Sequence, residues 1–133
     1  MDYRSLKKTV MDRLRKELSP HLVYHNTRHV RDVIRAAGQI AAQEGVRGEA
    51  LILLKTAALF HDTGFLFSAE GHEERSCELA GEYLPSYGYS GEAIEKIKGM
   101  IRATRLPNTR KPFAGKFWPT QIWIIWEEMI SLR

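Results

Sequence analysis

The chain has 133 residues, which is enough for one domain with a single core. Apolar residues make up 44% and charged residues 27%, an ordinary globular composition, and no apolar run approaches the roughly 18 residues of a membrane span. A single cysteine excludes an internal disulfide, and the charged N-terminus lacks the apolar stretch of a signal peptide. A reducing cytoplasm is therefore the expected location.

The net charge of +4 is distributed unevenly along the chain. Basic residues outnumber acidic ones by nine to four in residues 1–35 and by six to none in residues 96–111, whereas residues 44–95 are acidic. Such basic segments either attract phosphate groups to a nearby site or simply form solvated helix faces. Nothing in them indicates specific recognition of a nucleic acid, and no membrane partner is expected.

Apolar residues recur at helical spacing in several segments. In the first segment, residues 6–18, the apolar residues form an i, i+4 stripe that ends at Ser19-Pro20. The third segment, residues 48–61, is apolar on nearly every face, which is typical of a central helix. No segment alternates with a period of two for long enough to predict a sheet. The sequence therefore predicts an all-α fold, a compact bundle of about five helices, over residues 6–18, 27–45, 48–61, 70–84 and 90–104.

Histidine and aspartate stand at the ends of two of these helices. His29 lies in the first turn of the second helix, and His61 and Asp62 are adjacent at the end of the third. Ionisable groups beside a core cost free energy unless they are paired or metal-bound. Two imidazoles and a carboxylate suit a borderline or hard divalent ion. We therefore expect the three side chains to converge, which requires the two helices to pack together.

Four short blocks of this sequence resemble the HD superfamily of metal-dependent phosphohydrolases, over roughly residues 20–110. The blocks are Tyr24-His25-Asn26 with His29, then Ala57-Ala58-Leu59-Phe60-His61-Asp62-Thr63-Gly64, then Gly71-His72-Glu73-Glu74, and then Ile101-Arg102-Ala103-Thr104-Arg105-Leu106-Pro107. The resemblance implies that His29, His61 and Asp62 bind a divalent ion (Mn, Fe, Mg, Zn or Ni), with Asp62 also orienting water. It implies a substrate that is a nucleotide or another small phosphorylated metabolite.

Further polar residues are candidates for the same site. His72 and Glu73 either contact the phosphate and carry a proton or are exposed residues of a first helical turn. Arg102 and Arg105 are one turn apart and either bind a phosphate or form a solvated basic face. His25 is expected to brace the loop before the second helix rather than to bind metal.

The C-terminal segment departs from the family pattern. HD proteins of this kind supply a fourth ligand, an aspartate on a later helix, but no aspartate follows Asp62 in this chain. The codons of the tail can be read in another frame, in which the third base of each codon joins the first two bases of the next. Five residues of that reading are the same whichever synonymous codons are used: Leu at Phe117/Trp118, Ala at Trp118/Pro119, Asp at Trp123/Ile124, Gly at Trp126/Glu127 and Asp at Met129/Ile130. We interpret this pattern as a frameshift shortly before Gly115. The alternative is a natural amphipathic helix that presents Ile122, Ile125, Trp126 and Met129 on one face.

The sequence thus predicts an HD-like helical domain in residues 1–113 and an atypical, truncated tail in residues 114–133. Phosphohydrolase activity is expected to be impaired, because one metal ligand is missing. The alternative function is a non-catalytic helical module that self-associates. Lost C-terminal helices would leave an apolar patch on the third helix, which the tail covers either in its own chain or in a neighbouring copy. We expect the second arrangement, a homodimer through the exposed core or through an exchanged tail.

Overall fold

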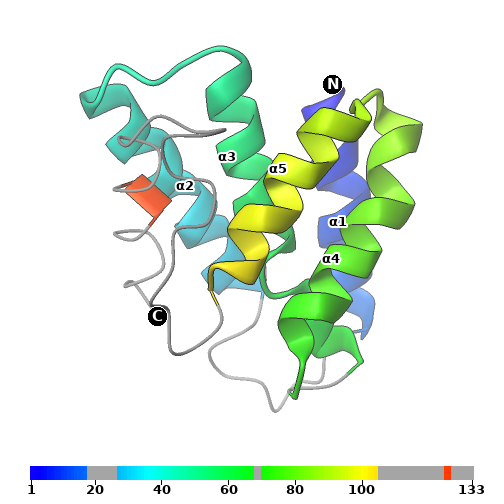
Figure 1. The fold of residues 1–133 in the computed structure, drawn as a ribbon. Coiled ribbons are helices and arrows are strands. Elements are labelled where there is room, and N and C mark those ends of the chain that lie inside the picture. The colour runs from blue at the N-terminus through cyan, green and yellow to red at the C-terminus, as the bar shows by residue number, and fades with distance from the viewer. Residues whose placement is uncertain (18–26, 68–69, 105–124, 127–133) are drawn as a thin grey trace.

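The computed structural model describes residues 1–17, 27–67, 70–104 and 125–126 (Figure 1). The elements are α1 (Tyr3–Glu17), α2 (Thr27–Gln43), α3 (Glu49–Phe60), η1 (Thr63–Leu66), α4 (His72–Tyr83), η2 (Leu84–Tyr87) and α5 (Gly91–Arg102), where η marks a short 3-10 helix. No strand occurs in these ranges. The all-α prediction is confirmed, and every α-helix begins and ends close to its predicted bounds. None of the described helices has both the length and the apolar character needed to cross a bilayer.

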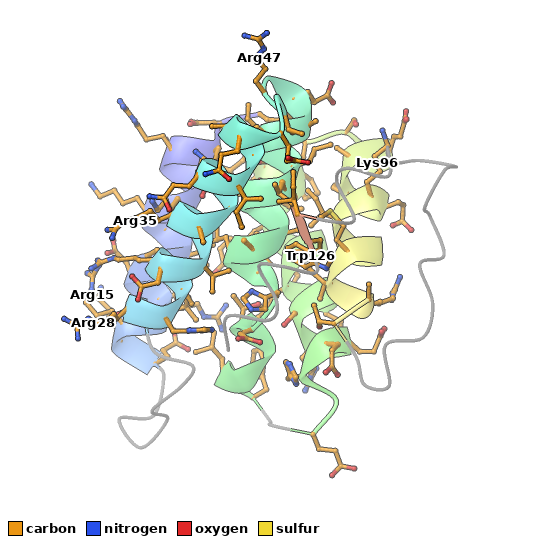
Figure 2. The ribbon with its side chains drawn as sticks, turned by 90° about the vertical axis from the view of Figure 1, so that its left-hand side faces the viewer. Arg15, Arg28, Arg35, Arg47, Lys96 and Trp126 are labelled. Atoms are coloured by element: carbon orange, nitrogen blue, oxygen red, sulfur yellow. The ribbon has the colours of Figure 1, made fainter. Side chains whose placement is uncertain are left out.

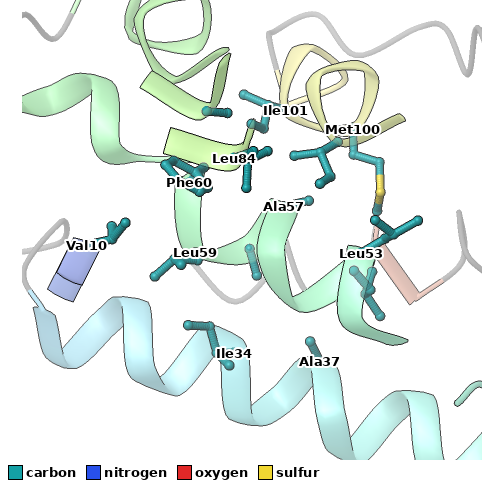
Figure 3. Close-up of a cluster of buried hydrophobic side chains, with 14 of the residues drawn as sticks. Val10, Ile34, Ala37, Leu53, Ala57, Leu59, Phe60, Leu84, Met100 and Ile101 are labelled. Atoms are coloured by element: carbon teal, nitrogen blue, oxygen red, sulfur yellow. The ribbon is translucent and has the colours of Figure 1, made fainter. Parts of the chain in front are cut away.

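The central helix of the bundle is α3, which contacts the other four α-helices. From Leu53 to Phe60 every side chain except that of Lys55 is buried. α2 packs on one side of α3 through residues such as Ile34, and α5 packs on another through residues such as Met100 (Figure 3). The predicted packing of the second helix against the third is therefore confirmed, and it brings the start of α2 and the end of α3 into one region.

Local signals fix where the next two helices begin. Gly71 precedes α4 with a φ of 69°, a left-handed conformation that glycine adopts without steric cost. At α5, the side-chain oxygen of Ser90 accepts a hydrogen bond from the backbone N–H of Ala93 at 3.1 Å. This contact satisfies one of the free donors of the first turn. Because Gly71 starts α4, His72 is the first residue of that helix.

The apolar patch expected on the third helix is not present in the described part of the chain. Ile125 and Trp126 are 0% and 1% exposed, and the indole N–H of Trp126 donates to the Met100 carbonyl at 2.9 Å. Among the described residues, the exposed large hydrophobic side chains are those of Met1 and Phe67.

The tail thus meets the core of its own chain at the two described positions. A dimer built by exchange of the tail would have to withdraw Ile125 and Trp126 from that core. The other two apolar residues of the proposed tail face, Ile122 and Met129, lie outside the described residues. Self-association and the boundary between residues 113 and 114 stay predictions.

Candidate metal centre

The imidazole of His61 is held in one tautomer at the end of α3. The ring is 1% exposed, and its Nδ1 lies 2.6 Å from the carbonyl oxygen of Ala58. A carbonyl only accepts hydrogen bonds, so Nδ1 must carry the ring proton. In the neutral ring Nε2 then keeps its lone pair, which is the arrangement that a metal-binding histidine uses.

Two further donor groups converge on this imidazole. His61 Nε2 lies 3.1 Å from Asp62 Oδ2, and His29 enters from the first turn of α2 with its ring centroid 6.5 Å from that of His61. One ligand atom from each of the three residues lies within 4.8 Å of the others. When the His61 ring is neutral, Nε2 and the Asp62 oxygen both offer electron pairs. A positive charge between these two atoms, either a second proton on the ring or a metal ion, stabilises the arrangement. The predicted convergence of His29, His61 and Asp62 is therefore found, and the donor set fits a divalent ion.

Hydrogen bonds hold the turn that carries His61 and Asp62. The hydroxyl of Thr63 donates to the Phe60 carbonyl at 2.8 Å. The buried hydroxyl of Ser76, on α4, accepts from the backbone N–H of Gly64 at 2.8 Å and donates to the His61 carbonyl at 3.1 Å. Ser76 thereby ties both ends of the turn to α4, and the orientation of the candidate ligands depends on that helix.

Replacing Ser76 with alanine is expected to lower the free energy of unfolding by about 2 kcal/mol, because it leaves a buried N–H and a buried carbonyl unpaired. Metal affinity should fall by about tenfold, the usual effect of losing a group that orients ligands. The matched control is Ser90→Ala, which removes the helix cap of α5 at a cost of about 1 kcal/mol. Chemical denaturation and metal titration of both variants check this; equal metal affinities would show that Ser76 does not orient the ligands.

His72 lies against the same carboxylate. It is 8% exposed, with Nε2 3.5 Å from Asp62 Oδ1 and Nδ1 3.3 Å from Glu73 Oε2. The sequence left open whether His72 and Glu73 are site residues or exposed residues of a first turn. The structure places His72 beside the candidate ligands, and Glu73 is adjacent to it through the second ring nitrogen.

Comparison with known proteins gives the family. The model of the HD domain matches residues 27–131, which is most of the chain and includes all the candidate ligands. The chain belongs to the HD domain family. The matched range also continues into the segment predicted to be an atypical tail.

One relative and one solved structure resemble this HD domain. An uncharacterized protein of Clostridium beijerinckii is 38% identical over 84 residues, 61% of this chain and 53% of that protein, so the chain spans about half the length of this relative. The crystal structure of a predicted HD superfamily hydrolase from an uncultured Thermotogales bacterium matches with a TM-score of 0.63 at 20% identity. That match covers 94% of this chain and 85% of the other, and it shows a shared fold.

Arg102 lies on the surface of this HD domain, where it pairs with an acidic residue of α4. Its guanidinium pairs with the carboxylate of Glu74, at 3.0 and 3.3 Å, and about half of the side chain is exposed. The pairing joins α5 to α4 on the surface. Arg105, the second predicted phosphate-binding arginine, and His25, which was predicted to brace the loop before α2, lie outside the described residues.

Sequence reasoning missed two side chains that shape the HD centre. Ser76 gave no signal because a serine within a helix is usually solvated. Trp126 packs its indole edge-on against His61, with ring centroids 6.2 Å apart at 80°. It gave no signal because it lies in the segment predicted to be an atypical tail. Cys77, by contrast, is a poor ligand, because burial raises the pKa of its thiol to about 12 and keeps it protonated.

Proposed function

We propose that this HD domain hydrolyses a phosphate ester by means of a divalent ion held by His29, His61 and Asp62. Membership of the HD family and the likeness to a predicted HD superfamily hydrolase support this proposal. The observation that carries it is the contact of His61 Nδ1 with the Ala58 carbonyl, because Nε2 of the same ring lies beside Asp62 in a group of donors that includes His29. The proposed substrate is a nucleotide or another small phosphorylated metabolite.

The chain's own residues have distinct roles in this proposal. A divalent ion supplies Lewis acidity, which lowers the pKa of water and polarises a phosphoryl oxygen. Asp62 orients the attacking water with a carboxylate oxygen, and His72 Nε2 carries a proton to the leaving oxygen. Glu73 holds the His72 ring through Nδ1, at the 3.3 Å separation found between them. The position of His72 between two carboxylates supports a proton-carrying role.

We further propose that the 133-residue form turns over slowly. Two imidazoles and one carboxylate leave the ion less rigidly held than a set that includes a further aspartate, and none follows Asp62. The indole of Trp126 supports this proposal, because it occupies space next to His61 with a group that cannot bind a cation through its N–H.

The test compares two chains that differ only in the tail, the 133-residue form and a form whose codons from residue 115 are read one frame on. Each is purified without metal, loaded with Mn, Fe, Mg, Zn or Ni, and assayed on nucleotides and on a generic phosphomonoester. The chain with the restored reading frame should be faster by about 100-fold, the size of effect found when metal geometry is perturbed. Asp62→Asn in each chain is the control and should remove the activity.

Two results would contradict these proposals separately. If both chains are equally active, the tail aspartates are dispensable and the slow turnover proposed for this form is wrong. If neither chain hydrolyses any phosphate ester with any of the five metals, although both bind metal, the phosphohydrolase proposal itself is wrong.

A further inference from the structure

A basic groove lies between α1, α2 and α3, separate from the metal centre. Its larger part is a hollow of about 540 Å³ that four cationic side chains line, those of Lys7, Arg31, Arg35 and Lys55. Among the described residues that line this part, none is acidic. Because successive helical residues are rotated by about 100°, Arg31 points to the flank of α2 opposite His29. The groove is therefore not a subsite of the metal centre.

The groove continues along α1 into a second hollow of about 330 Å³, which shares Lys7 and Arg31 with the first. Three more cations line this part, Arg4, Lys8 and Arg15. Asp12, the acidic residue among the described residues of this lining, is already paired with Arg15 at 2.9 Å. The two hollows together form a continuous cationic surface.

The cations of the larger hollow lack counter-charges. Within the part of the chain that the structure describes, no ion pair links Lys7, Arg31, Arg35 or Lys55 to a carboxylate. Lys7 and Lys55 are also half-buried. The stem of Lys55 lies over Gly38, where an added Cβ would be 3.4 Å from its Cε. Like charges gathered in a hollow repel one another, and a bound anion relieves that repulsion.

The lining favours a small anion over a macromolecule. A volume of about 540 Å³ is within the range of small-molecule sites. Within the described part of the chain, no aromatic residue lines the two hollows, so this lining offers no stacking surface of the kind that single-stranded nucleic acids use. It also lacks the exposed large apolar side chains that insert into a membrane surface, since those of the described chain are Met1 and Phe67. Several cations within one hollow match an anion with several linked phosphates.

We propose that this groove is a second anion site, which binds a small molecule carrying two or more linked phosphates. Inorganic triphosphate is the probe, and it is titrated calorimetrically into the whole chain in the presence of EDTA, so that no metal ion can hold phosphate. Saturable binding that weakens as salt rises is expected. ATP is titrated in parallel, and equal affinity for the two shows that the phosphate chain is the part recognised.

The variant is Arg31→Gln with Arg35→Gln, since both side chains are exposed and the fold tolerates their loss. The control is Arg47→Gln with Lys96→Gln, which removes the same charge from other faces of the molecule (Figure 2). The first pair should weaken triphosphate binding by about tenfold or more, and the control by less than about twofold.

Three results would overturn the proposal. The first is no binding of triphosphate by the unmodified chain at millimolar concentration. The second is an equal loss in both double variants, which would mean that only net charge matters. The third is binding of an RNA oligonucleotide or of anionic lipid vesicles that depends on Arg31 and Arg35 and that triphosphate does not displace.

Discussion

Replacing His61 with alanine is expected to abolish metal binding. The imidazole is the candidate ligand whose donor atom is fixed by a contact of its own, the 2.6 Å bond from Nδ1 to the Ala58 carbonyl. Without it, His29 and Asp62 remain as a two-ligand set, too few for a site of this class. We expect affinity to fall by more than about 100-fold, measured as metal stoichiometry after dialysis and as a titration.

The control for His61→Ala is a buried polar residue of the same helix. Thr56 is 0% exposed and lies 2.7 Å from both the Ile52 carbonyl and the Tyr89 hydroxyl. Thr56→Val should cost stability by about 1 to 2 kcal/mol and leave the metal stoichiometry unchanged. If His61→Ala binds metal with the affinity of the unmodified protein, its imidazole is not a ligand.

Replacing Gly64 with alanine has the largest expected effect on stability. A Cβ at this position would lie 2.0 Å from the carbonyl oxygen of His72 and 2.9 Å from its Cα. Both are backbone atoms, so no change of rotamer relieves the overlap, and η1 must separate from the start of α4. We expect a loss of about 3 kcal/mol in the free energy of unfolding, measured by urea denaturation.

The same substitution should also damage the site. Separation of η1 from α4 moves His72 away from Asp62 and breaks the bond from the Gly64 N–H to Ser76, so metal affinity should fall together with stability. Gly91→Ala is the control, because nothing lies within 4 Å of its added Cβ, and it should be neutral or stabilising by about 0.5 kcal/mol. Equal stabilities for the two variants would mean that the close approach at Gly64 does not exist.

The helices could be predicted because an apolar stripe depends only on residues a few positions apart. The three candidate ligands could be predicted because two of them are adjacent and the third begins the helix that must pack on them. The position of His72 beside Asp62 could not be predicted from local patterns, since it depends on the close approach of η1 at Gly64 and on the left-handed turn at Gly71. Neither feature has a periodic signal.

Two features of the structure depend on residues that are far apart in the sequence. The carboxylate partner of Arg102 is Glu74, which lies 28 positions earlier on another helix. The helix α3 is apolar on nearly every face, and the elements that pack on it include all four of the other α-helices. Contacts between distant segments decide both features, and local patterns do not encode them.

A crystal structure of the manganese-loaded protein, with anomalous data collected to locate the ion, tests directly whether His29, His61 and Asp62 bind a divalent metal. We expect one anomalous peak bonded to His61 Nε2, to His29 and to an oxygen of Asp62, with Nδ1 of His61 still on the Ala58 carbonyl. A peak at another place, or no peak while His61 Nε2 remains beside Asp62, would contradict it.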